Sequence, residues 1–426
     1  PTGYPLYILL GRLFAALPVG SVAWRINIAS AVFATSALSL LYLAGRRLWK
    51  EPIAALLAAV LFGLTPTFWS QAVEAEVYAL HALVVAGALW LMAVMHDHGI
   101  EADCCATPVF GWPSSSGWQQ TVWMLTLVIA LGLTNHLTSI ILIPAAVLAV
   151  WLAYGKCLRS QGWTANGLLL LKVGLAILLP LLLYAYLPLR WEALHEEPMG
   201  WGRFVDWVIG GRFQGALQLT AWLNDQTRYE IVWRLLLAEW GWYNLLLALL
   251  GLIYAAVRNW RVALVLLVTW AGYIFYALNY HVPDLAVFLI PAYAVIALLW
   301  GAGMASILAI IASLLDRRGW TAYRFPLSAV IILLLILPAL GRVVRNWPDS
   351  LYRDQVALQV WGEGVLSMPL EQNAAVLADS EKIAPLYYLQ QAEGRRPDLD
   401  IMVLPDEAAY RAEVDARVPA GQTVYL

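Results

Sequence analysis

Four polar side chains recur at helical spacing between two apolar stretches of the chain. Gln71, Glu74, Tyr78 and His81 stand at i, i+3, i+7 and i+10, so a helix through this segment would carry them on one face. Hydrocarbon disfavours such a polar stripe, which must therefore face protein or a water-filled cavity. Glu76 lies in the same segment, and charge at a membrane edge is usually functional. The segment is our first candidate for a binding or catalytic site.

Two arginines stand at the edges of other apolar stretches. Arg25 lies a few residues inside one of them, and Arg190 ends the run Tyr184–Arg190. A guanidinium group held at this depth can bind a lipid phosphate through two hydrogen bonds. The alternative is that both side chains merely snorkel to the membrane surface.

Some aromatic residues lie beside these charged groups. Trp69, Tyr78, Trp191 and Trp201 are placed where aromatic planes could flank a sugar ring or an isoprenoid chain. The alternative for each is an ordinary place in the aromatic belt at the membrane surface, and the belt accounts for most of the 22 tryptophans and 20 tyrosines.

Two further polar positions follow apolar runs. Asn135 and His136 stand where one run ends, and Asp284 follows His281-Val282-Pro283 before a long apolar segment. Asp284 could simply cap a helix, and His136 could be a hydrogen-bonded structural histidine. A functional role for His136 and Asp284 is favoured because several separate segments contribute polar groups to one side of the membrane. Together these residues indicate an active site that faces outward.

Composition fixes the class of element that must position these residues. The chain has 426 residues, is 62% hydrophobic and 13% charged, and has a mean hydropathy of +0.69, which excludes a soluble domain with one core. Runs long enough to cross hydrocarbon recur about ten times. We predict an all-α polytopic membrane protein with about ten transmembrane helices, near Val22–Leu43, Ile53–Thr67, Val77–Met95, Val122–Thr134, Leu137–Tyr154, Leu168–Leu187, Trp242–Val257, Val262–Tyr280, Leu285–Leu315 and Pro326–Val344.

The basic residues predict the orientation, because short loops rich in Lys and Arg stay in the cytoplasm. Such residues occupy every second connection, so the candidate site residues fall on the opposite, extracytoplasmic face. We predict three parts: an outer interfacial helix in residues 1–20, a transmembrane core in residues 21–345, and an extracytoplasmic α/β domain in residues 346–426. The α/β domain rests on short strands expected near Ala374–Ala378, Ile401–Leu404 and Val424–Leu426. The alternation of predicted spans puts the start of the chain on the outer face, and its first residue is Pro1, so upstream sequence is expected to be missing. The end of the chain is also expected to be truncated.

The net charge of −2 indicates no polyanionic partner, so nucleic acid is not expected. No carboxylate cluster builds an obvious metal site, and neither a metal nor another cofactor is expected. The partners we expect are the lipid bilayer itself and a substrate that reaches the outer face.

The same residues carry a resemblance to a known family. The chain resembles GT-C membrane glycosyltransferases related to the transmembrane protein O-mannosyltransferase that modifies plexin-type receptors, together with its prokaryotic relatives. The resemblance covers nearly the whole chain and rests on Pro1–Tyr7, Ala23–Asn27, Phe68–Tyr78, Gly132–His136, Tyr186–Arg190, Pro283–Asp284 and Ile290–Tyr293.

The resemblance implies an enzyme that transfers a sugar, with mannose as one candidate, from a polyprenyl-phosphate carrier to a protein or glycan acceptor outside the cytoplasm. A bacterial or archaeal plasma membrane is the expected location. In this family the main base lies in the first outer loop, which is expected upstream of Pro1, so this chain alone is expected to be inactive. Glu74 and Glu76 are the catalytic candidates that remain, as a secondary base or as acceptor-orienting groups.

The other site residues take roles in the same reaction. Arg190, Arg25 and His136 are predicted to bind the donor phosphate and to stabilise it as it departs. The predicted substrate-binding residues are Trp69, Gln71, Tyr78, His81, Asn135 and Asp284.

Two other classes of protein compete with this interpretation. A lipid or solute transporter would also place ionisable residues between helices, but it should show broken helices and polar groups deep in several spans. A noncatalytic membrane scaffold predicts that Glu74, His136 and Arg190 do not converge in space.

Overall fold

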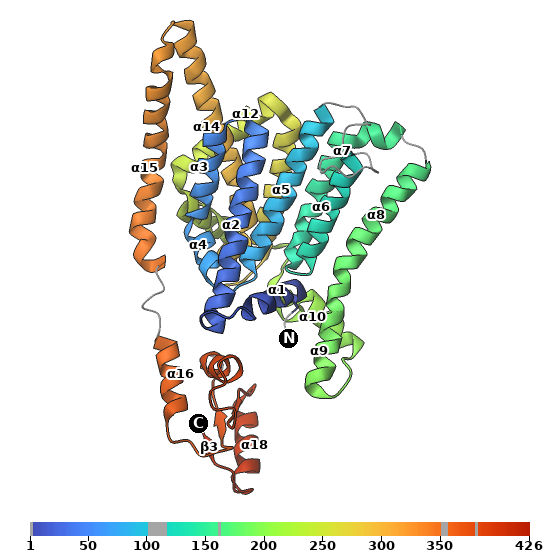
Figure 1. Ribbon diagram of the computed structural model, residues 1–426, viewed down its shortest axis with the longest axis vertical. Coiled ribbons are helices and arrows are strands. Elements are labelled where there is room, and N and C mark those ends of the chain that lie inside the picture. The colour runs from blue at the N-terminus through green and yellow to red at the C-terminus, as the bar shows by residue number, and fades with distance from the viewer. Residues whose placement is uncertain (1–2, 101–116, 161–162, 351–356, 380–381) are drawn as a thin grey trace. The chain divides into compact units, whose positions relative to one another are not determined.

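The computed structural model describes residues 3–100, 117–160, 163–350, 357–379 and 382–426 (Figure 1). The chain divides into two compact units, one formed by Pro1–Leu17 and Ile26–Asn346 and the other by Pro18–Arg25 and Trp347–Leu426. The first part of the helical unit holds α1 (Pro5–Ala15), α2 (Val22–Trp49), α3 (Pro52–Gly63), α4 (Pro66–Val73), α5 (Tyr78–Ile100), α6 (Gly117–Leu133), η1 (Leu137–Ile141), α7 (Leu142–Ser160) and α8 (Trp163–Leu181).

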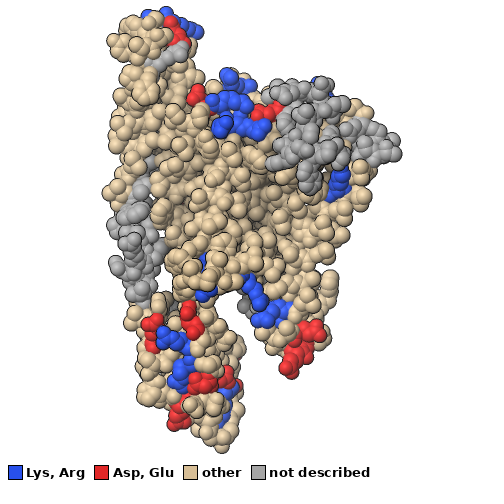
Figure 2. All heavy atoms as spheres, viewed as in Figure 1, with Lys and Arg blue, Asp and Glu red and all other residues tan. Residues whose placement is uncertain are grey.

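The remainder of the helical unit alternates short and long elements. These are η2 (Leu182–Ala185), α9 (Tyr186–His195), α10 (Trp201–Ile209), η3 (Gly211–Ala216), α11 (Ala221–Asn224), α12 (Thr227–Asn279), α13 (Leu285–Phe288), α14 (Ile290–Arg317), η4 (Thr321–Tyr323) and α15 (Arg324–Ser350). On the face shown in Figure 2, charged side chains of this unit gather toward the ends of the helices, and the middle is largely uncharged. That distribution is expected of helices that cross a membrane.

The fold class is confirmed as a polytopic helical one, but the predicted count of about ten transmembrane helices was wrong. The described residues contain six helices that are long and apolar enough to span a membrane, or seven if the bent pair α3 and α4 counts as one span. The two spans predicted near 242–257 and 262–280 both lie in α12, where they are separate helical segments divided by a break at Asn259. The backbone also leaves helical geometry at Gly241, which adopts a positive φ of 69°. One reason for the lower count is that α6 has only 17 residues.

One continuous helix through Gln71 and His81, the condition under which the four polar residues would share a face, does not form. Helix α4 ends at Val73, Glu74 is extended, and α5 begins at Tyr78. The two carboxylates in the break follow the C-terminus of one helix and precede the N-terminus of the next. A helix dipole repels anions at the first of these positions and attracts them at the second, which favours the break.

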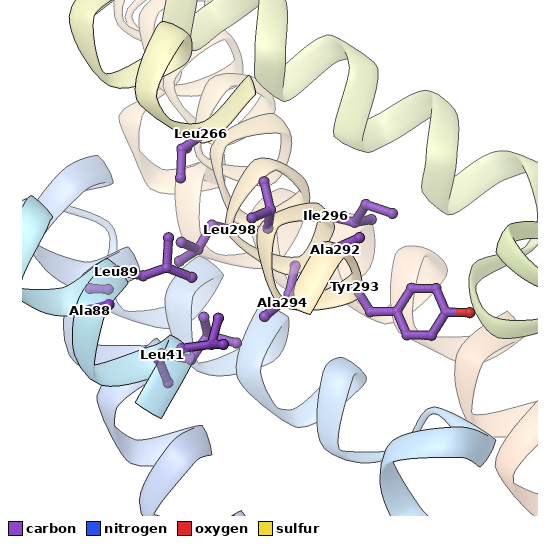
Figure 3. Packing of buried hydrophobic residues seen from close by; sticks show 14 of the residues in the cluster. Leu41, Ala88, Leu89, Leu266, Ala292, Tyr293, Ala294, Ile296 and Leu298 are labelled. Carbon is purple, nitrogen blue, oxygen red and sulfur yellow. The ribbon is translucent and has the colours of Figure 1, made fainter. Parts of the chain in front are cut away.

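The core of the helical unit forms around α14, which is buried on all sides from Ile290 to Ser306. Side chains from α2, α5 and α12 pack against it, as Figure 3 shows for Leu41, Leu89 and Leu266. Helices α12 and α14 cross at two glycines. A Cβ atom on Gly251 would overlap the carbonyl oxygen of Leu299, and one on Gly303 would overlap that of Leu247. Small residues therefore set how closely these helices approach.

The second unit contains a parallel sheet with the strand order β2-β1-β3. Its elements are α16 (Ala357–Ser367), β1 (Ala375–Leu377), α17 (Ile383–Tyr387), the π-helical segment η6 (Tyr388–Ala392), β2 (Asp400–Met402), α18 (Glu407–Arg417) and β3 (Val424–Tyr425). The three strands lie where the sequence predicted them, so a small α/β fold follows the helical unit. The functional division into residues 1–20, 21–345 and 346–426 stays a prediction.

Candidate active site

A cavity of about 670 Å³ lies in the helical unit at the N-terminal end of α5. Its walls come from segments far apart in the sequence. The residues that line it are mainly aromatic and polar: Gly3, Tyr4, Tyr78, His136, Leu137, Thr138, Asp206, Trp207, Val208, Ile209, Gly210, Gly211, Gln214, Leu217, Tyr276, Tyr280, Val282, Asp284 and Phe288. The volume falls in the range of small-molecule sites.

The start of the chain forms one wall because it is fastened to the end of α6. The backbone N–H of Leu6 donates to the carbonyl of Thr134 over 3.2 Å. The ring of Tyr4 is thereby held parallel to the ring of His136, at a centroid separation of 6.2 Å. An N-terminal segment that the sequence only placed at the surface thus contributes an aromatic side chain to the site.

His136 lies at the centre of an aromatic group. Its ring centroid is 5.4 Å from that of Tyr78, 5.6 Å from that of Phe288 and 4.9 Å from that of His81. Its Nδ1 atom lies 2.6 Å from the hydroxyl of Thr138. The ring is therefore fixed in orientation by contacts on several sides.

The opposite wall depends on Arg228, a residue that sequence reasoning missed. Its buried guanidinium group donates to the carbonyls of Leu278 over 3.3 Å, Ala277 over 2.7 Å and Tyr280 over 2.5 Å. These are orphan carbonyls at the C-terminus of α12, and satisfying them fixes the turn that carries Tyr280 into the cavity. Arg228 lies toward the end of the outer stretch predicted from Pro188 to about Trp240, and nothing in the sequence there signalled this role.

A pair of backbone hydrogen bonds ties the same turn to the segment after α10. Gln218 N–H donates to the Asn279 carbonyl over 2.8 Å, and His281 N–H donates to the Ala216 carbonyl over 2.8 Å. Helix α10, which precedes this segment, contributes Asp206 and Trp207, which were not predicted as site residues. The only sequence signal was that this stretch lies outside the membrane and is rich in aromatic residues.

Three of the predicted site residues line the cavity: Tyr78, His136 and Asp284. Two others lie behind its wall. His81 is buried, 3.2 Å from the Thr138 hydroxyl, and Asn135 is buried with its amide donating to the Val77 carbonyl over 3.2 Å. Of Glu74, His136 and Arg190, the three residues whose convergence separates an active site from a scaffold, only His136 lines the cavity.

The remaining predicted residues do not line the cavity. Gln71 donates to Glu74 over 3.5 Å near the end of α4, and Trp69 is half-buried on α4. Glu76 is exposed in the turn before α5, and Arg190 is exposed on α9. Arg25 belongs to the second unit, where its Nε donates to the Ser21 carbonyl over 3.2 Å.

The site combines a neutral histidine with nearby carboxylates. Burial lowers the pKa of His136 to about 4, so its ring is uncharged at neutral pH. Partial desolvation raises the pKa of the Glu76 carboxyl although the residue as a whole is exposed, and the charges of Glu74 and Asp284 raise it further. No Lys or Arg is among the described residues that line the cavity. His136 therefore meets a ligand here through hydrogen bonding and not through charge.

The fold is that of the GT-C membrane glycosyltransferases. ArnT from Cupriavidus metallidurans, solved with undecaprenyl phosphate bound, matches 98% of this chain and 78% of its own with a TM-score of 0.53 at 13% identity. The Archaeoglobus fulgidus oligosaccharyltransferase, solved with a tethered acceptor peptide, matches 95% of this chain and 57% of its own with a TM-score of 0.50 at 14% identity. At these identities the likeness shows the fold alone.

The sequence comparisons point to a particular family. Residues 1–157 match the family described as the protein O-mannosyl-transferase TMEM260 N-terminal domain. The mouse protein O-mannosyl-transferase TMEM260 is 31% identical over 207 residues, which are 47% of this chain and 26% of that protein. Its Dictyostelium discoideum counterpart is 25% identical across 94% of this chain and 52% of that protein. The predicted resemblance is confirmed.

The chain thus spans about half, or less, of the length of these curated relatives. Both relatives are eukaryotic, so they do not bear out the bacterial or archaeal location that the sequence suggested. The multi-pass membrane architecture itself is supported by the six long apolar helices and by the fold.

Proposed function

We propose that this chain is the membrane-embedded part of a glycosyltransferase that moves a sugar from a polyprenyl-phosphate carrier to a protein or glycan acceptor. Mannose is the sugar we propose, since the named relatives are O-mannosyl-transferases. The donor is a substrate, and no resident cofactor or metal is proposed. Among the described residues no group of three or more His, Cys, Asp or Glu side chains could hold a metal ion.

The observation that carries this proposal is the cavity at the N-terminal end of α5. Its aromatic side chains suit a sugar ring, and its polar groups suit the hydroxyls and the phosphate of a donor. Because it opens among the ends of apolar helices, a lipid-linked donor can reach it while its chain stays in the hydrocarbon.

In the proposed reaction an acceptor hydroxyl oxygen forms a bond to the anomeric carbon of the sugar. The bond from that carbon to the carrier phosphate breaks, and the polyprenyl phosphate leaves with the electron pair. A base takes the hydroxyl proton. Glu74 and Glu76 stay our proposed secondary bases or acceptor-orienting groups, and the raised pKa of Glu76 favours proton exchange.

The carrier phosphate is proposed to contact His136 in the cavity and Arg190 at the surface. His136 supplies a neutral hydrogen-bond donor, and Arg190 supplies positive charge. Arg190 makes no ion pair or hydrogen bond with the described part of the chain, which leaves its guanidinium group available. We propose that the cavity lies outside the cytoplasm, because the basic loops lie at the opposite ends of the helices.

The test is sugar release from a panel of polyprenyl-phosphate sugars, followed by detection of free polyprenyl phosphate and of the glycosylated acceptor. The intact protein in detergent is compared with its His136→Ala variant and with His96→Ala, which alters a histidine at the other end of α5. Release that depends on His136 and not on His96 supports the proposal. A folded protein that releases sugar from no donor contradicts it.

One observation favours a second candidate, a lipid or solute transporter. Helices α3 and α4 form a pair bent by 71°, and broken helices often line transport sites. A proteoliposome assay with a fluorescent polyprenyl-phosphate lipid separates the two functions, since a transporter moves the lipid without cleaving its sugar. The scaffold alternative is not excluded by convergence, because only His136 of the three residues that test it lines the cavity.

A further inference from the structure

A chain of hydrogen bonds runs from the cavity into the protein through His136. Its Nδ1 atom lies 2.6 Å from the Thr138 hydroxyl, and the same hydroxyl lies 3.2 Å from Nε2 of His81. Nδ1 of His81 lies 3.3 Å from the Ser139 hydroxyl. His136 and Thr138 line the cavity, whereas His81 and Ser139 are buried behind them. The positions of the protons in this chain decide what His136 offers to a ligand.

The Thr138 hydroxyl has a single proton, so it can donate to only one of the two histidines and must accept from the other. The two imidazole tautomers are therefore coupled. If Thr138 donates to His136, then Nε2 of His136 carries a proton and is a donor toward the cavity. If His136 donates to Thr138, then its Nε2 is a bare acceptor.

Ser139 selects between these two arrangements. In the first, Nε2–H of His81 donates to Thr138, and the Ser139 hydroxyl donates to Nδ1 of His81, so every proton between His136 and Ser139 has an acceptor and only Nε2–H of His136 is left for a ligand. In the second, Nδ1–H of His81 donates to Ser139, and the hydroxyl proton of Ser139 has no acceptor among the described residues. Ser139 is fully buried, and a buried donor without an acceptor is costly.

We propose that His136 presents Nε2–H to the cavity as a neutral hydrogen-bond donor, and that His81, acting through Thr138, is a positioning residue that fixes this tautomer. The ligand atom that it suits is an oxygen that accepts a hydrogen bond, from a phosphate or from a sugar hydroxyl. Naming that ligand rests on the proposed transferase function. The assignment of the tautomer rests on the hydrogen-bond chain alone.

Local packing holds the chain of hydrogen bonds in place. The hydroxyl of Tyr273 donates to the Thr138 carbonyl over 3.3 Å, and the rings of His81 and Tyr273 are 6.3 Å apart. The backbone N–H of Ser139 donates to the His136 carbonyl over 3.0 Å. The short segment η1 is thus fixed by both its own turn and α12, which keeps the two hydroxyls aimed at the two rings.

The test is ¹⁵N NMR of the intact protein labelled at histidine, with the His136 signals assigned from a His136→Gln variant. We expect a pyrrole-type Nε2 and a pyridine-type Nδ1 for His136 in the unaltered protein. Thr138→Val removes the coupling hydroxyl with little change of volume and should move the His136 signals toward a mixture of tautomers. Thr269→Val is the matched control, because Thr269 is equally buried but bonds only to Val265 in its own helix.

A pyridine-type Nε2 on His136, or His136 signals unchanged by Thr138→Val, would overturn the proposal. Sugar transfer supplies a second readout. We expect Thr138→Val to lower it about tenfold, and Thr138→Ser, which restores the hydroxyl, to stay within about twofold of the unaltered protein. If the NMR result holds while no variant transfers sugar, the tautomer assignment stands and the proposed function fails.

Discussion

Histidine and carboxylate side chains lie at both ends of α5, yet the two groups are organised differently. At its C-terminal end Asp97 pairs with Arg47 over 2.7 Å and with Lys50 over 3.3 Å, and Nε2 of His96 lies 2.5 Å from the amide of Asn259. At its N-terminal end the carboxylate of Asp284 and the Nε2 atom of His136 make no hydrogen bond to another side chain among the described residues, and both residues line a large cavity.

The two ends of α5 also differ in the size of the pocket beside each histidine. The pocket next to His96 has only about 40 Å³ and is lined mainly by apolar side chains, whereas the cavity beside His136 has about 670 Å³. Polar residues at a membrane edge are therefore not equivalent. Where their hydrogen bonds are made among themselves they join helices, and where they surround a cavity they are available to a ligand.

The largest expected difference between the two ends concerns transfer activity. His136→Ala removes a donor from the cavity, and we expect sugar transfer to fall about a hundredfold, as for the loss of one preorganised donor. His96→Ala at the other end should leave transfer within about twofold. Initial rates on a polyprenyl-phosphate sugar measure both, with thermal unfolding as the check on folding. Equal losses in the two variants would remove the functional distinction between the ends.

A smaller effect is expected for predicted residues that lie outside the cavity. In the full-length protein, Arg190→Ala and Glu74→Gln should each lower transfer by at least about tenfold, which is the effect of losing one transition-state contact. Their KM and kcat values, measured in the same assay, show whether the loss affects binding or the chemical step. Unchanged rates in both variants would confine the site to the residues that line the cavity.

At the paired end we expect an effect on stability and none on transfer. Asp97→Asn removes the negative charge that pairs with both Arg47 and Lys50, and because these side chains are partly exposed the loss should be about 1 kcal/mol or less. Thermal unfolding at low and high salt measures it, since salt weakens an exposed ion pair. A large fall in transfer with stability unchanged would contradict the structural role.

The smallest expected effect is a pH dependence from Glu76. Because its pKa is raised in the folded protein, the fold favours the protonated carboxyl, and this contribution is present below the unfolded pKa and lost as pH rises through the folded pKa. Glu76→Gln should therefore raise the melting temperature slightly at neutral pH and leave it unchanged below pH ~4. A lower melting temperature for the variant than for the unaltered protein at pH 7 would contradict this prediction.

Part of the candidate site could be predicted from the sequence. Tyr78, His136 and Asp284 were identified because polar residues beside apolar runs are unusual whatever the fold. Tyr4, Asp206 and Trp207 were missed as site residues, since an aromatic or acidic residue in an outer loop has many ordinary explanations. Arg228 was missed because its role is to satisfy carbonyls about fifty residues away, and no local pattern encodes such a contact.

The number of spans shows a similar limit. Hydropathy located the apolar runs and separated the two in α12, which a break at Asn259 divides, but it could not tell that α3 and α4 bend by 71°. Hydropathy sums transfer free energies along the chain, and bends at Gly241 and Asn259 depend on packing against other helices.

The sequence by itself determined that this protein is a polytopic helical membrane protein with a small α/β unit after the helices, because transfer free energy and strand pattern are properties of local composition. Its motifs also carried the family resemblance. Only the tertiary structure decided which polar residues share a cavity and which way the protons in the His136 chain point. Both depend on distances between segments that are far apart in the sequence, and hydrogen bonding and burial act through those distances.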